Sequence, residues 1–144
     1  MADAADISQL AGTWKLVSFV MVDEETKKQE PLYGAHPNGY LILLPEGRMM
    51  TVITGENRKS KPETDEDRVA AFKSMLAYSG TYKVDGDRFV TKVDTAWNQS
   101  WVGSDQKRTY RVEGDQLTII SMAQPAVNFE NRMMHGELVW QRVK

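Results

Sequence analysis

Segments in which apolar residues alternate with polar ones, or run together with β-branched and aromatic residues, recur along the whole chain. Such segments predict strands, because successive side chains of a strand point to opposite faces. The first of them lacks both the capping residue and the polar face of a surface helix. The clearest strand segments are residues 12–22, 39–45, 48–54 and 133–142, and residues 28–33 are a candidate for a further short strand.

Two tight turns of one kind place four further strands. Residues 82–89 and 110–117 share the pattern Y-x-V-[DE]-G-D-x-[FL]. Gly86 and Gly114 supply the positive φ that a tight turn needs, and the flanking residues alternate between apolar and polar. Because no third copy occurs, we interpret the pattern as one turn used twice and not as a solenoid repeat.

Residues 63–77 interrupt the strands and predict one short helix. Thr64 is a candidate N-cap, acidic residues fill the first turn, and Val69, Phe72 and Leu76 lie on one stripe. Residues 1–10 are expected to form an N-terminal lead-in, and residues 1–144 a single domain.

The order of these elements predicts the fold class. Eight or nine short strands in hairpin succession, with turn signals every 8–12 residues, indicate a β-sandwich or a barrel. The absence of a long crossover favours an all-β, up-and-down antiparallel barrel with one helix inserted in mid-chain. Closure also removes the exposed edges that apolar strands would otherwise present.

Composition and charge narrow the classes of partner. Eighteen Lys and Arg against twenty Asp and Glu give a net charge of −2, which is a poor basis for binding nucleic acid. The chain has no cysteine and therefore no disulfide or thiolate metal site. Its apolar runs are far shorter than the ~20 residues of a membrane-spanning helix, and its first residues lack a basic signal-peptide start. We expect a cytoplasmic protein with neither nucleic-acid nor membrane partners.

The two ends of the predicted barrel carry a family resemblance. Trp14 opens the first strand within Gly-Thr-Trp, and Arg142 closes the last within Trp-Gln-Arg. This pair resembles the Trp and Arg that seal the base of lipocalins, where a guanidinium covers the indole. Five blocks in order resemble the lipocalin-like domain family of small bacterial and fungal proteins: residues 12–19, 38–50, 77–82, 101–106 and 136–142.

The resemblance implies a barrel with an internal cavity, and Trp14 and Arg142 as its structural closure. The family is mostly without assigned activity, so the resemblance implies little chemistry. We expect the chain to differ from secreted lipocalins, because it has no cysteine for a disulfide, its first residues do not resemble a signal peptide, and its predicted helix lies in mid-chain. We therefore do not expect extracellular transport.

Alternation also predicts which side chains line the lumen, which in an eight-stranded barrel is either filled or able to hold one small ligand. If Trp14 points inward, Leu16, Ser18 and Val20 follow on the same face. The candidate ligand-binding residues are Tyr40, Tyr78, Trp97, Trp101, Arg108, Tyr110 and Met134. Trp97 and Trp101 lie at a strand end, where either pocket lining or ordinary rim packing is expected.

Arg108 is the charged exception in this predicted lumen. A buried guanidinium is costly unless it is paired, so it is expected to meet a carboxylate. The partner is either an internal acid such as Asp94 or Asp105, or a group on an acidic or carbonyl-bearing ligand. A one-residue slip in register would instead turn Arg108 to solvent.

The candidates for acid or base catalysis are His36, His135 and Tyr82. Imidazole titrates near neutrality, and one His in the lumen would be enough to move a proton. A lone His is more often a satisfied structural residue. The two histidines are far apart and show no metal-ligand spacing, so no metal site is expected. The sequence has neither a P-loop nor a G-x-G-x-x-G motif, and no cofactor is expected.

Three functions remain open from the residues. The first is the binding of a small, largely apolar molecule in the lumen. The second is a cofactor-independent isomerase, cyclase or hydratase that uses a lumen His, Tyr or Asp. The third is an interaction role, in which the apolar outer face of the first strand makes a homodimer.

Overall fold

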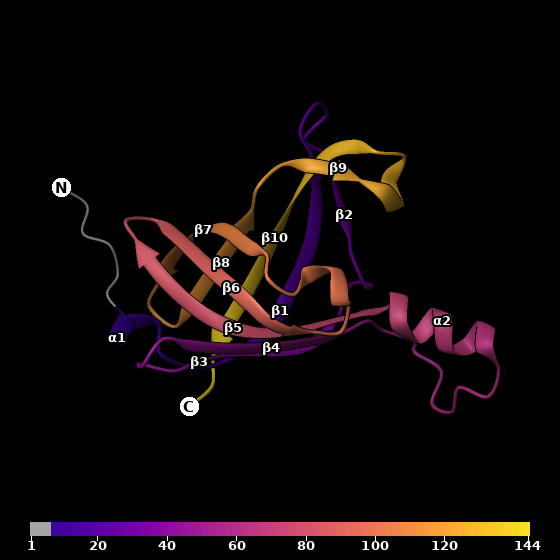
Figure 1. The fold of residues 1–144 in the computed structure, drawn as a ribbon. Helices are drawn as coiled ribbons and strands as arrows, with labels where there is room; N and C mark the ends of the chain where they lie inside the picture. Colours follow the sequence, from indigo (N-terminus) through magenta and orange to yellow (C-terminus); the bar gives the residue numbers. More distant parts are fainter. Residues whose placement is uncertain (1–6) are drawn as a thin grey trace.

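The computed structural model describes residues 7–144, which form mostly antiparallel strands (Figure 1). Residues 1–6 of the predicted lead-in lie outside the described part, and a short helix occupies the rest. The elements in chain order are α1 (Ile7–Leu10), β1 (Gly12–Asp23), β2 (Gln29–Pro31), β3 (Asn38–Leu43), β4 (Arg48–Thr54), α2 (Asp65–Lys73), β5 (Met75–Asp85), β6 (Arg88–Ala96), η1 (Gln99–Trp101), β7 (Asp105–Glu113), β8 (Gln116–Ser121), β9 (Gln124–Ala126), η2 (Val127–Phe129) and β10 (Arg132–Arg142).

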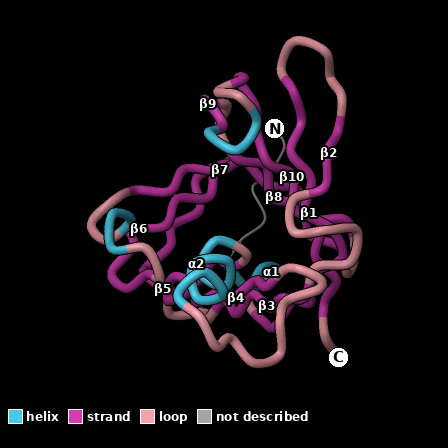
Figure 2. The backbone as a smooth tube through the Cα atoms, turned by 90° about the vertical axis from the view of Figure 1, so that its right-hand side faces the viewer, coloured by secondary structure: helices cyan, strands magenta, loops and turns pink. Residues whose placement is uncertain are grey.

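Eight of these strands close into a barrel. Their order is β1-β3-β4-β5-β6-β7-β8-β10, and β10 pairs back onto β1, with Trp14 opposite Arg142. The short β2 and β9 add to the far ends of β1 and β10. Figure 2 shows the strands arranged as a ring, with α2 at the end that faces the viewer. The predicted all-β, up-and-down barrel with a mid-chain helix is confirmed.

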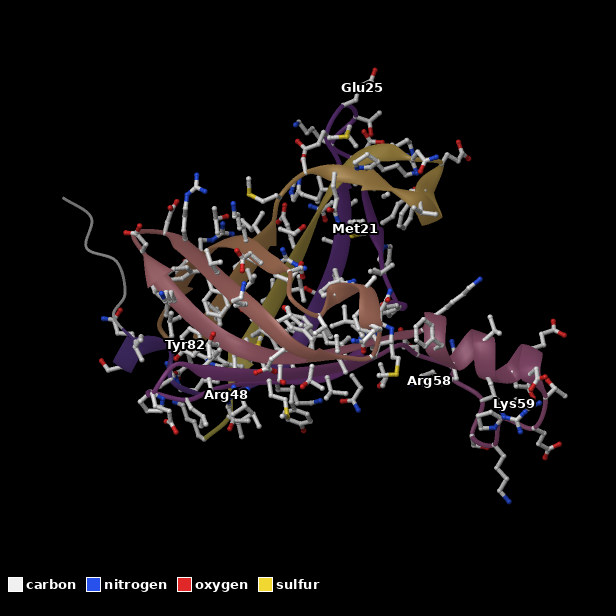
Figure 3. The ribbon with its side chains drawn as sticks, in the orientation of Figure 1. Met21, Glu25, Arg48, Arg58, Lys59 and Tyr82 are labelled. Atoms are coloured by element: carbon white, nitrogen blue, oxygen red, sulfur yellow. The ribbon has the colours of Figure 1, made fainter. Side chains whose placement is uncertain are left out.

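The two ends of the barrel are built differently. At one end, here called the base, tight turns join β3 to β4, β5 to β6 and β7 to β8, and each contains a glycine with positive φ. At the other end, here called the mouth, the connections carry α2, η1, η2 and β9. Tyr82 lies toward the base and Met21 toward β9, as Figure 3 shows.

A β-bulge in β1 changes the predicted lumen. The register with β10 shifts between Leu16 and Ser18. A bulge adds one residue to a strand and so reverses which later side chains point inward. Phe19 and Met21 therefore line the interior, and the prediction that Ser18 and Val20 do so is wrong. The same shift reduces the expected outer apolar face of β1 to the exposed Val17.

The helix α2 is shorter than the predicted 63–77. Thr64 caps it, with the Asp67 backbone N–H donating to the Thr64 side chain and the Asp67 carboxylate accepting from the Thr64 N–H. The helix ends at Lys73 because Met75 and the next residues pair with β4 instead. Its side chains include none that is buried, and it projects from the mouth (Figure 1). Among the described helices, none is long and apolar enough to cross a lipid bilayer.

Candidate functional site

The barrel encloses a cavity of about 480 Å³ between the base and the mouth. Its wall is mostly apolar, with Phe19, Leu41, Met49 and Ile119 among the side chains from the strands. A largely apolar cavity of this size, open at one side, is typical of a site for one small organic molecule. The cavity is therefore the candidate functional site.

An aromatic cluster forms the floor of the cavity at the base. Phe89 lines the cavity and stacks on Tyr82, with ring centroids 5.2 Å apart, while Tyr110 meets Phe89 edge-on at 6.5 Å. The Tyr82 hydroxyl donates to the carbonyl of Leu44 at 2.7 Å. Neither Tyr82 nor Tyr110 is part of the cavity wall. Tyr82 as a catalytic group and Tyr110 as a ligand-binding group therefore find no support in this geometry, because both pack beneath the floor.

A second aromatic cluster lies at the mouth. Trp97 and Trp101 both line the cavity, with ring centroids 5.0 Å apart, and Trp101 lies 5.3 Å from Tyr78. Phe72 of α2 lies 6.2 Å from Trp97 and connects the helix to this cluster. The structure thus places the predicted residues Tyr78, Trp97 and Trp101 together on one side of the cavity wall.

Arg108 is the charged side chain of the cavity wall, as far as the described residues go. Its Nη1 donates to the carbonyl of Lys107 at 3.0 Å, and its Nη2 donates to Oε1 of Gln106 at 3.0 Å. The two internal acids considered as partners are engaged elsewhere. Asp94 accepts from Arg48 at 2.8 Å, and Asp105 lies 3.8 Å from Lys92. Within residues 7–144, no carboxylate pairs with Arg108.

Tyr78 is the titratable neighbour of Arg108 in the cavity. Burial raises the pKa of the Tyr78 hydroxyl, and the positive charge of Arg108 partly offsets that rise. Burial also raises the pKa of Tyr33, whose hydroxyl donates to the carbonyl of Met75 at 3.2 Å. Both phenols are therefore neutral at physiological pH and act as hydrogen-bond donors or acceptors, not as charges.

The two histidines lie outside the cavity. His36 is exposed in the loop before β3. His135 points away from the lumen and is bound by Glu24 through Nδ1 and by Glu137 through Nε2, the latter at 2.7 Å. Burial lowers the pKa of His135, but the bonds from Glu137 and Glu24 outweigh this and raise it. The alternation of β10 explains the outcome, since Gly136 and not His135 lines the cavity.

Two predicted ligand-binding residues also lie away from the cavity wall. Tyr40 is on the outer face of β3, 45% exposed, with the Lys15 ammonium 4.6 Å from its ring centroid. It alternates with Leu41, which lines the cavity. Met134 points inward but is fully buried beyond the cavity, where β10 meets β9. Neither residue is placed to touch a ligand in the lumen.

Sequence reasoning missed the part of the wall that comes from the short strands. Leu32 and Tyr33 after β2, and Gln124, Pro125 and Phe129 around β9 and η2, all border the cavity at the mouth. These strands have three residues each, too few for an alternating pattern to be visible. The run of apolar side chains around Pro125 is the one signal that could have indicated a buried segment.

Among residues 7–144, no cluster of three or more His, Asp or Glu is placed to hold a metal ion.

Comparison with known proteins assigns the family. No similar curated protein is found for the chain. The family model described as a lipocalin-like domain matches residues 11–143, which span the whole barrel. The chain, with its closed eight-stranded barrel and internal cavity, therefore belongs to the lipocalin-like domain family.

Proposed function

We propose that this protein binds a small, largely apolar molecule in the barrel cavity, with an acidic or carbonyl group of that molecule near Arg108. The observation that carries the proposal is an apolar cavity of about 480 Å³ with the Arg108 guanidinium in its wall, which has no carboxylate partner among the described residues. Apolar walls supply affinity, and a few fixed polar groups supply orientation. Arg108 is well suited to the second task because two hydrogen bonds hold it in place.

Binding is favoured over proton transfer as the role of the cavity. A general acid or base has to reach the reacting atom within hydrogen-bond distance. The His, Asp and Glu side chains of residues 7–144 all lie outside the cavity wall, and its two tyrosines are kept neutral by burial. The predicted acid or base roles of His36 and His135 therefore have no geometric support, and we propose no reaction.

A neutral fluorescent probe tests the proposal directly. N-phenyl-1-naphthylamine is expected to brighten on titration with the purified protein, because the apolar wall shields it from water, and to saturate at one molecule per chain. Native mass spectrometry of the same protein, beside a denatured sample, is expected to show a bound small molecule that denaturation releases. Absence of saturable probe binding would contradict the proposal.

Two variants of β10 locate the binding site. Leu138 lines the cavity, so Leu138→Trp is expected to fill the lumen and reduce probe affinity at least about tenfold. Val139 is the next residue and points to the other face of β10. Val139→Trp adds the same side chain outside and is expected to leave the affinity unchanged. Equal effects of the two variants would place the probe elsewhere on the protein.

A further inference from the structure

Tyr78 differs from the other buried tyrosines in how its hydroxyl is used. The hydroxyls of Tyr33, Tyr82 and Tyr110 each donate to a backbone carbonyl, at 3.2, 2.7 and 3.1 Å. Among the residues that the structure describes, the Tyr78 hydroxyl has no hydrogen-bond partner, although its ring lies in the cavity wall. Tyr78 is half-buried, and its hydroxyl is not one of the side-chain atoms that are both fully buried and without a partner, so it is accessible from the cavity. A ligand in the cavity can therefore accept its hydrogen bond.

Arg108 lies in the same cavity wall and acts electrostatically on Tyr78, and among the described residues it has no counter-ion. Its hydrogen bonds to Gln106 and to the Lys107 carbonyl are made to neutral acceptors and occupy two of its five N–H donors. A neutral carbonyl on a ligand would accept another hydrogen bond but leave the positive charge uncompensated. A carboxylate would do both, and such charge-assisted bonds are about twice as strong as neutral ones.

The positions of these groups indicate how a ligand would lie. On β7, Arg108 is one inward position above Tyr110, which packs beneath the floor, and one below Gln106, which bonds to Ser104 near the mouth. The guanidinium is therefore at middle depth. An anion bound there would direct the rest of the molecule toward the mouth, since the aromatic floor blocks the other direction.

The wall between Arg108 and the mouth is aromatic. The rings of Tyr78, Trp101 and Trp97 follow one another at centroid distances of 5.3 and 5.0 Å. Offset and edge-on contacts between rings at such distances add to the energy of apolar burial. A flat, unsaturated body next to the anionic group would contact this whole series, whereas a compact polar body would not.

We propose, building on the function proposed above, that the ligand is an aromatic carboxylate whose carboxylate is bound by Arg108 and Tyr78 and whose ring system lies against Trp101 and Trp97. The carboxylate accepts from the guanidinium and from the phenol hydroxyl. The ligand enters ring-last, with its charged group toward the floor. The ligand carboxylate then supplies the negative counter-charge for Arg108 and an acceptor for the Tyr78 hydroxyl, which neither group finds among the described residues.

A matched pair of ligands tests the charge requirement. Naphthoate and its neutral amide, naphthamide, have the same ring system and differ in charge at the head group. At neutral pH, calorimetry and tryptophan fluorescence are expected to give about tenfold or greater preference for naphthoate, from the charge-assisted bonds to Arg108. Equal affinities, or a preference for naphthamide, would overturn the proposal.

Variants on one strand assign the preference to its residues. Arg108→Gln is expected to abolish the preference for naphthoate and to leave naphthamide affinity within about threefold, because the apolar wall is intact. Lys107→Gln makes the same charge change on the exposed face of β7 and is expected to leave the preference in place. Tyr78→Phe is expected to weaken naphthoate binding by about tenfold or more, because the hydrogen bond that it removes is made to a charged acceptor.

The outcomes separate this proposal from the one on which it rests. If naphthamide and the neutral probe bind but naphthoate has no advantage, the cavity is a binding site and only the anionic class is wrong. If Arg108→Gln and Lys107→Gln reduce the preference equally, the effect comes from net charge and not from the cavity, which also overturns it. If none of the three molecules binds, both proposals fall.

Discussion

The base of the barrel and its cavity contain the same kinds of side chain, used in opposite ways. At the base, the Trp14 indole donates to the Leu10 carbonyl at 2.9 Å, and the Arg142 guanidinium lies 4.2 Å above its ring. Arg142 also donates to the carbonyls of Ala11 and Gln9, at 3.0 and 2.6 Å. In the cavity, Arg108 has no counter-ion among the described residues.

The contrast separates side chains that stabilise the closed end of the barrel from a side chain that is available to bind a ligand. Where an indole or a guanidinium is bonded to backbone carbonyls from another element, its removal leaves those carbonyls unsatisfied and opens a void. Where a guanidinium faces an open cavity, its removal takes away a charge that the fold itself does not use. Substitutions at the base should therefore lower stability more than substitutions in the cavity do. Substitutions in the cavity should change ligand binding more than substitutions at the base do.

The largest expected effect is at the base. Trp14→Ala should lower the free energy of unfolding by about 3–5 kcal/mol, because a fully buried indole leaves a cavity under α1 and unsatisfies the Leu10 carbonyl. Urea denaturation followed by circular dichroism measures this loss. A loss below about 1 kcal/mol would show that the base is not the closed end of a tightly packed core.

Arg142→Met should have the second largest effect, with about 1–3 kcal/mol lost, since two hydrogen bonds to carbonyls and a cation–π contact disappear while the apolar cover is kept. Arg111 is a matched control. It is exposed on β7 and pairs with Glu113 at 3.3 Å. Arg111→Met should change stability by no more than about 0.5 kcal/mol, and similar losses in both variants would contradict the special role of Arg142.

A smaller, pH-dependent effect is expected at His135, on the outer side of the cavity half. Because its pKa is raised in the folded protein, its protonated form adds stability that is fully present below its unfolded pKa of about 6.5, as long as Glu24 and Glu137 are ionised. This contribution is lost as pH rises through the folded pKa. The stability difference between wild type and His135→Gln, measured by urea denaturation from about pH 6 to pH 9, should therefore shrink. A constant or growing difference would contradict the charged bridge.

The smallest effect on stability is expected in the cavity itself. Arg108→Met should leave the free energy of unfolding of the ligand-free protein within about 0.5 kcal/mol of wild type, or raise it, because the change removes a half-buried charge without a counter-ion. Urea denaturation of Arg108→Met and Arg142→Met under the same conditions allows the two losses of stability to be compared directly. A loss as large as that of Arg142→Met would mean that Arg108 is part of the fold and not available to a ligand.

Much of the barrel is predictable from its strands. The hairpin around Gly47 and the two repeated glycine turns lie where the pattern puts them, because tight turns and alternation are local properties. The helix is a mixed case. Its start at Thr64 is a local capping signal, but its end is decided by the pairing of Met75 with Thr54 on β4. Intrinsic helix propensity is weak beside a row of strand hydrogen bonds.

The candidate site is less predictable than the fold, for two reasons visible in particular residues. The bulge after Leu16 moves Phe19 and Met21 into the lumen, and no residue type at that point announces it. The mouth is completed by Tyr33 and Phe129, which come from segments too short to show a period. Both failures concern register, on which the inner or outer position of every side chain depends.

The sequence by itself predicted the fold class from alternation and turn chemistry, and the closing pair Trp14 and Arg142 from the family resemblance. It also predicted an inward Arg108, with a one-residue slip in register as the alternative. Only the tertiary structure decided that Asp94 and Asp105 are bound by other cations and that His135 faces outward. Pairing of charges depends on distances between strands that are far apart in the chain, and a local sequence pattern contains no information about those distances. As a result, Arg108 has no counter-ion among residues 7–144, and the cavity is a candidate site for an anion.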